Sequence, residues 1–205
     1  MSEIIQFLQQ APEESAYYAL ASVLGLLSIL FMLRRMRKSA TRRRIKRALK
    51  SFGGQVVENI TLSDGVEGNV QIDFCIYTRG RVLVLKIQDY PGILFGGEKI
   101  EQWTQVFEGK SYKFTNPLYY NRVCVQAVRD QLPGAKVFGR VVFTNNGEFP
   151  KGIPEGVSML DCLLDDARVF ARAPVDKDAS LDVWQDFVGS LGSSSQTIVY
   201  KMQSA

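Results

Sequence analysis

The chain has 205 residues with a net charge of +4, and it contains three cysteines and no histidine. The lack of histidine excludes Ser-His and Cys-His nucleophilic catalysis as well as any histidine metal site. The cysteines, Cys75, Cys124 and Cys162, show no C-x-x-C spacing, so we expect buried thiols in a reducing compartment.

A run of 18 uncharged, mostly apolar residues occupies positions 16–33. As a helix, this run would nearly span a hydrocarbon core of ~30 Å. The 15 residues before it contain no Lys or Arg, whereas a cleavable signal peptide begins with basic residues. We therefore predict an external leader at residues 1–15 and a single transmembrane helix at residues 16–33.

Ten basic residues and no acidic residue lie between Arg34 and Lys50. By the positive-inside rule, this block places the N-terminus outside and the rest of the chain in the cytoplasm of a bacterium, anchored to its inner membrane. The basic side chains nearest the apolar run, Arg34, Arg35, Arg37 and Lys38, are expected to contact anionic lipid. Nucleic-acid binding by the same block is the alternative.

The charge of the remaining chain has the opposite sign. Residues 51–205 carry 15 basic and 18 acidic residues, a net charge of −3. A broadly basic surface for nucleic acid is therefore not expected on the folded part.

The alternation of apolar and turn-forming residues after the basic block predicts an α/β domain. A first helix is expected within the basic juxtamembrane segment at 34–52, followed by a core at 53–150. The expected core elements are strands at 55–62, 70–77 and 81–88, a hairpin at 103–107 and 112–114, a helix at 117–131 and a strand at 136–144. Residues 151–205 are predicted to form a C-terminal α/β extension that packs on this core.

Three polar residues on neighbouring strands are candidates for a site. Asp73 lies on the second predicted strand, and Lys86 and Gln88 end the third. Side chains two residues apart on a strand share a face, so these three side chains are expected to converge at one edge of the sheet. Judged from the residues alone, the alternative is that Asp73 and Lys86 are ordinary edge charges that discourage aggregation.

Five short sequence motifs follow one another between residues 71 and 118. They are Gln71-Ile72-Asp73, Tyr90-Pro91-Gly92, Phe95-Gly96, Gln102-Trp103-Thr104-Gln105 and Phe114-Thr115-Asn116-Pro117-Leu118. Over residues 53–145, this series resembles the nuclease-related domain (NERD) family of the PD-(D/E)XK superfamily. The resemblance implies a restriction-endonuclease-like core in the order α-β-β-β-α-β, preceded here by the predicted membrane helix.

The same resemblance assigns roles to single positions. Asp73 matches a metal-binding position, Lys86 stands where the family has Glu, and Gln88 stands where it has Lys. Tyr120 stands where the family usually has Gln after Asn-Pro. A ligand groove is therefore implied at Gln71, Lys86 and Tyr120, for nucleic acid or another phosphorylated compound.

Lys86 argues against hydrolysis. Mg²⁺, the cofactor implied if the site is active, is bound by one or two carboxylates, water and substrate phosphate, and Lys86 brings the formal charge of the pair with Asp73 to zero. We therefore predict a nuclease-related domain without hydrolytic activity and without a cofactor. Two hypotheses stay open beside it: an active Mg²⁺-dependent nuclease in which Asp89 or Glu98 supplies the missing ligand, and an inert cytoplasmic platform for a membrane-protein partner.

Overall fold

The computed structural model describes residues 2–50, 52, 54–65, 68–172, 181–191 and 200–202. Within these ranges, the side chains of residues 2–16, 19, 34–40, 171–172 and 200–202 are not among those described. The chain divides into two compact units, Met1–Arg44 and Ile45–Ala205.

The first unit is formed by the helix α1 (Ser2–Lys50), which continues into the second unit. The described side chains of residues 17–33 are all exposed, among them Leu27 at 56% and Phe31 at 68%. Among the described residues, no helix is both long and apolar enough to cross a membrane, so the span predicted at residues 16–33 is not found there. The side chains of the predicted lipid contacts, Arg34, Arg35, Arg37 and Lys38, lie outside the described residues.

The second unit is built on a six-stranded sheet with the strand order β10-β1-β2-β3-β7-β9. The strands are β1 (Gly54–Ser63), β2 (Asn69–Thr78), β3 (Arg81–Gln88), β7 (Lys136–Phe143), β9 (Val157–Met159) and β10 (Tyr200–Met202). β10, β1, β2 and β3 pair antiparallel, whereas β3, β7 and β9 pair parallel. Parallel neighbours need a crossover connection, and the connection from β3 to β7 contains α2 (Pro117–Gln131).

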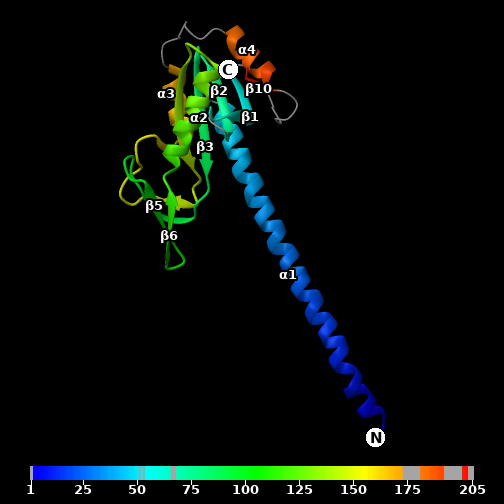
Figure 1. Ribbon diagram of the computed structural model, residues 1–205. Coiled ribbons are helices and arrows are strands. Elements are labelled where there is room, and N and C mark those ends of the chain that lie inside the picture. The colour runs from blue at the N-terminus through cyan, green and yellow to red at the C-terminus, as the bar shows by residue number, and fades with distance from the viewer. Residues whose placement is uncertain are drawn as a thin grey trace. The chain divides into compact units, whose positions relative to one another are not determined.

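A second sheet has four strands in the order β6-β5-β4-β8. Its strands are β4 (Gly92–Phe95), β5 (Gln102–Phe107), β6 (Lys110–Thr115) and β8 (Gly147–Glu148). β5 and β6 form the predicted hairpin, in which Glu108 and Gly109 make a two-residue turn (Figure 1). Both turn residues have positive φ, 51° and 74°, as the type I′ turns that suit twisted hairpins require.

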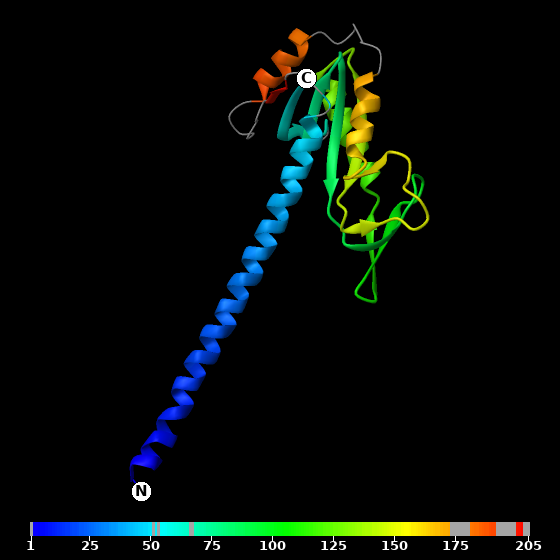
Figure 2. The same ribbon diagram turned by 180° about the vertical axis from the view of Figure 1, so that it is seen from behind.

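Helices cover both faces of the large sheet (Figures 1 and 2). Besides α1 and α2, the helices are α3 (Leu163–Arg172) and α4 (Leu181–Ser190). α2 and α4 pack on one face, where Val84 of β3 and Trp184 of α4 share a buried cluster. The C-terminal end of α1 and α3 pack on the other face through Leu49 and Leu163. A third cluster surrounds Trp103 of the small sheet.

The mixed α/β class is confirmed, and the small sheet is an addition that the sequence did not predict as such. The chain order α1, β1, β2, β3, α2, β7 follows the predicted helix, three strands, helix and strand, with β4, β5 and β6 inserted before α2. The predicted first helix is not separate, because it is the end of α1. Residues 34–50 contain no Gly or Pro that would interrupt a helix.

Candidate functional site

The two central strands of the large sheet separate at Asp73 and Lys86. β2 and β3 pair from Thr78 and Arg81 as far as Phe74 and Leu85. Beyond that point, β2 stays paired with β1 and β3 stays paired with β7. Asp73 and Lys86 are the next residues outward, and we call the opening that they form the fork.

Asp73 and Lys86 form an ion pair at the fork. The Lys86 Nζ atom lies 3.0 Å from Asp73 Oδ1, and the two side chains are 18% and 24% exposed. The other carboxylate oxygen of Asp73 accepts a hydrogen bond of 2.7 Å from the backbone N–H of Ile87. Both oxygens of Asp73 therefore have partners, and the carboxylate binds a main-chain N–H at the point where the strand ladder ends.

Tyr120 and Gln71 complete the surroundings of Lys86. The Lys86 ammonium also donates to the carbonyl oxygen of Gln71 at 3.3 Å and lies 5.3 Å from the centre of the Tyr120 ring. The Tyr120 hydroxyl accepts a hydrogen bond of 2.8 Å from the Gln71 N–H. The structure thus brings together the predicted residues Gln71, Lys86 and Tyr120, but Gln71 takes part through its main chain.

Gln88 contacts the neighbouring strand β7 through its main chain. It pairs in register with Phe143 of β7, and its carbonyl accepts a hydrogen bond of 2.9 Å from Thr144 N–H. Strand alternation places its side chain on the same face as that of Lys86. The side-chain contacts of the fork itself are made by Asp73, Lys86 and Tyr120.

The two carboxylates considered as replacement ligands contact other residues. Asp89 accepts hydrogen bonds from the Thr144 hydroxyl and from Asn146 Nδ2. Glu98 lies 3.8 Å from the Arg122 guanidinium, and both of those side chains are more than half exposed. Within the described part of the chain, there is no group of three or more His, Cys, Asp or Glu side chains that could hold a metal ion.

Cys124 is a member of the fork that the sequence analysis did not single out. Burial raises the pKa of its thiol to about 11, while the nearby Lys86 lowers that pKa and Asp73 raises it. Its spacing of four residues from Tyr120 on α2 was the available signal, since such residues lie on one helix face. Cys75 is buried as expected, whereas Cys162 is exposed, so the prediction of three buried thiols is wrong for Cys162.

Several of the motifs that suggested the family form the packed structure beside the fork. Gly96 lies under the Trp103 ring, where a Cβ atom would come within 2.2 Å of a ring carbon. Trp103 is fully buried and donates from Nε1 to the Gly97 carbonyl at 3.1 Å. The Gln105 side chain donates to the Pro91 carbonyl at 2.7 Å. These residues fix the small sheet and the turn that follows β3.

Asn116 connects the small sheet to the start of α2. Its side-chain oxygen accepts from the Leu118 N–H at 2.9 Å, which caps the helix. Its Nδ2 atom donates to the Ile100 carbonyl at 2.8 Å, and the residue is fully buried. Because α2 carries Tyr120 and Cys124, this capping contact positions the helix that closes one side of the fork.

Comparison with known proteins gives a family match for this chain. The family model described as "Nuclease-related domain" matches residues 37–144. An uncharacterized protein of Bacillus anthracis is 30% identical over 82 residues, which cover 38% of this chain and 39% of that protein. The chain therefore spans about two fifths of the length of this curated relative. No solved structure shows a significant match. Because the matched residues 37–144 make up more than half of the 205-residue chain, it belongs to the nuclease-related domain family.

Proposed function

We propose that this chain is a nuclease-related domain without hydrolytic activity that binds a phosphorylated ligand, in the simplest case a nucleic acid, at the fork. The observation that carries the proposal is the 3.0 Å contact between the Lys86 ammonium and the Asp73 carboxylate. In this proposal, the ammonium takes the place of a catalytic cation and supplies a fixed positive charge.

The residues of the fork do not fit the Mg²⁺ that the family implies. One oxygen of Asp73 contacts the ammonium, and the other accepts the Ile87 N–H. Mg²⁺ binds carboxylate oxygens together with water and substrate phosphate, yet the formal charge of Asp73 and Lys86 together is zero. A divalent cation would have to displace the ammonium, so no metal-dependent step is expected here.

The proposed binding of a phosphorylated ligand rests on the third N–H donor of the Lys86 ammonium. Its ammonium has three N–H donors, and two of them have acceptors in Asp73 Oδ1 and the Gln71 carbonyl. A phosphate oxygen fits as the third acceptor, because lysine binds phosphate as a point charge. Since residues 51–205 carry a net charge of −3, binding is expected to depend on this local contact rather than on a broad positive field.

A cleavage assay tests the loss of hydrolysis. The full chain is incubated with DNA or RNA and either Mg²⁺ or Mn²⁺, and we expect no shorter products. Cleavage that disappears on Asp73→Asn would contradict the proposal and favour an active nuclease that uses Asp89 or Glu98.

A binding assay tests the role of Lys86. Lys86→Met should weaken binding of a labelled oligonucleotide by about tenfold, the loss expected for a charge-assisted hydrogen bond. Lys110→Met removes an exposed positive charge from β6 and is the matched control that should leave binding unchanged. To remove binding by the basic block, all proteins in this assay carry Gln at Arg42, Arg43, Arg44 and Arg47. Equal binding by Lys86→Met and the control, or no binding at all, would favour the inert platform.

We also propose that residues 16–33 attach the chain to the inner membrane of a bacterium, with the N-terminus outside and the domain in the cytoplasm. The support is the 18-residue uncharged run and the ten basic residues that follow it. A reporter fused after Ala205 should be active only on the cytoplasmic side. Activity only on the external side would contradict this orientation, and a reporter released by washing the membranes at high pH would contradict the attachment.

A further inference from the structure

The large sheet has a short open edge along the first part of β7. On one side, β3 pairs with β7 from Lys136 to Phe143. On the other side, β9 pairs only with residues 141–143. In the described part of the chain, no strand pairs with residues 136–140 on that second side.

The hydrogen bonds at the two ends of this edge show which residues point outward. Val141 donates its N–H to the Gly156 carbonyl at 2.9 Å, and the Val137 carbonyl accepts from Arg129 at 3.0 Å. The N–H and C=O of one residue point to one side of a strand, and those of the next residue point to the opposite side. The N–H and C=O of Gly139, midway between Val137 and Val141, therefore also point to the open side of β7. Gly139 is exposed, and a glycine in a strand allows another backbone to approach closely.

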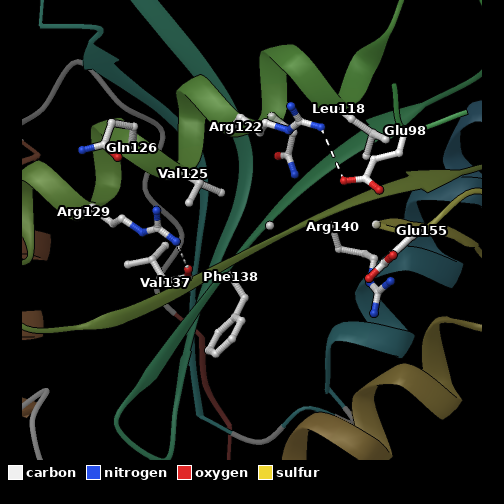
Figure 3. Close-up of a pocket in the computed structure, with 13 residues that line it drawn as sticks. Glu98, Leu118, Arg122, Val125, Gln126, Arg129, Val137, Phe138, Arg140 and Glu155 are labelled. Atoms are coloured by element: carbon white, nitrogen blue, oxygen red, sulfur yellow. Dashed lines mark hydrogen bonds and ion pairs between the residues drawn. The ribbon is translucent and has the colours of Figure 1, made fainter. Parts of the chain in front are cut away.

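A groove of about 590 Å³ follows this edge. Its volume lies in the range of ligand-binding pockets. Figure 3 shows Arg122 and Arg129 projecting from α2 on one side and Arg140 from β7 on the other. Val125 contributes apolar surface from α2. The groove lies on a different flank of α2 from the fork, which Tyr120 contacts.

Asn121 adds a buried side-chain amide to the lining of this groove. The residue is 4% exposed and lines the groove. Within the described residues, its buried Oδ1 atom has no hydrogen-bond partner. The Asn121 amide packs against Gly139, where a Cβ atom would lie 2.6 Å from Asn121 Nδ2. The Asn121 amide therefore covers the face of Gly139, and its Nδ2 atom is the nearer of its two polar atoms.

We propose that this groove binds an extended, acidic peptide segment of a partner protein, which adds as a short strand to the open edge of β7. A peptide backbone alternates N–H donors with C=O acceptors and so matches both groups of Gly139, with an N–H left for Asn121 Oδ1. Acidic side chains match the guanidinium groups, because arginine and carboxylate form charge-assisted, often bidentate, hydrogen bonds.

The charge of the groove favours such a peptide. Three arginines line it, Arg122, Arg129 and Arg140, against two glutamates, Glu98 and Glu155. Arg129 uses one of its five N–H donors on Val137. Arg122 lies 3.8 Å from Glu98 and is 57% exposed, so both arginines retain donors for a further carboxylate. This partner site is independent of the phosphate site proposed at the fork.

The test uses the full chain and a fluorescent peptide, acetyl-Glu-Val-Glu-Val-Glu-amide, measured by fluorescence anisotropy. We expect saturable binding that Arg140→Gln and Asn121→Leu each weaken by about tenfold, the usual loss of one such contact. Asn121→Leu should not lower the melting temperature, because the lost carbonyl has no partner to lose. Lys86→Met, which alters only the fork, should leave peptide binding unchanged.

Two ligand controls separate strand addition from general charge attraction. The same peptide with all five residues N-methylated keeps its charges but loses the N–H donors of those residues, and it should bind about tenfold more weakly. The peptide acetyl-Lys-Val-Lys-Val-Lys-amide should not bind. Equal binding of the N-methylated peptide, or no binding of the acidic peptide at a concentration of about 1 mM, would overturn the proposal. So would an oligonucleotide that binds more weakly to Arg140→Gln, since that result would make the groove a nucleic-acid surface. If Asn121→Leu fails to fold, Arg122→Gln and Arg140→Gln, at surface positions, carry the same test.

Discussion

The Lys86 ammonium lies 3.0 Å from the Asp73 carboxylate at the point where β2 and β3 separate, and neither side chain is more than a quarter exposed. Partial burial strengthens such a pair, because less water screens the two charges. It also makes the pair vulnerable, because loss of one partner leaves the other charge partly buried and uncompensated.

Lys86→Met is expected to lower the free energy of unfolding by about 1 kcal/mol, the upper end for a partly exposed ion pair. The double variant with Asp73→Asn should lose less than the sum of the two single changes, because each residue acts through the other. Urea unfolding of all four proteins measures this coupling. Arg168→Met breaks an exposed pair with Asp165 and should cost less than about 0.5 kcal/mol. A coupling energy of zero between Asp73 and Lys86 would contradict the contact.

A metal site should appear at the fork when the charge of residue 86 is reversed. Lys86→Glu together with Gln88→Lys gives a second carboxylate beside Asp73, and carboxylate oxygens are the ligands that Mg²⁺ and Mn²⁺ prefer. Titration calorimetry with Mn²⁺ is expected to detect binding in this variant and none in the unaltered chain. Adding Asp73→Asn should abolish the new binding. Equal Mn²⁺ binding before and after the exchange would show that Lys86 does not keep the cation out.

Gly96→Ala should destabilise the protein by about 1–3 kcal/mol, the usual cost of overpacking. The added Cβ atom would come within 2.2 Å of the Trp103 ring, which is fully buried and has little room to move. Gly189→Ala in α4 is the control, because a Cβ atom there meets nothing within 4 Å and alanine favours a helix. Thermal unfolding should therefore show a lower melting temperature for Gly96→Ala only. Equal melting temperatures would contradict the close packing at Gly96.

The Cys124 thiol should make stability fall at high pH. Its pKa is raised from an ordinary value of 9.0 to about 11, chiefly by burial. Between these values, the unfolded chain has lost a proton that the folded chain keeps, so the free energy of unfolding decreases as pH rises from about 9 to about 11. Urea unfolding across this range should show a smaller decrease for Cys124→Ala. A steeper decrease in that variant would contradict the raised pKa.

The sequence predicted the major elements because their apolar periodicity is strong. The hairpin and α2 also carried explicit local signals, since Gly109 marks the turn and Asn116-Pro117 marks the start of the helix. β8 could not be predicted from pattern, since a strand of two residues shows no usable alternation.

The fork was predicted in its side chains but not in its main chain. Strand alternation placed Asp73 and Lys86 on one edge, and the structure brings them into contact. Gln71 and Ile87 contribute backbone groups, which every residue possesses and which no residue type reveals. The open edge of β7 was likewise hidden, because it depends on how far β9 extends along its neighbour.

The contacts of Gly96, Trp103 and Asn116 have a consequence for how relatives of this chain are interpreted. Their partners are backbone carbonyls, a helix N–H and a neighbouring ring, which are separate from the side chains of the fork. Substitutions at the fork therefore leave these particular contacts in place. The motifs that suggested the family thus hold the small sheet and the start of α2 in place, whereas the proposed function depends on the separate contact between Asp73 and Lys86.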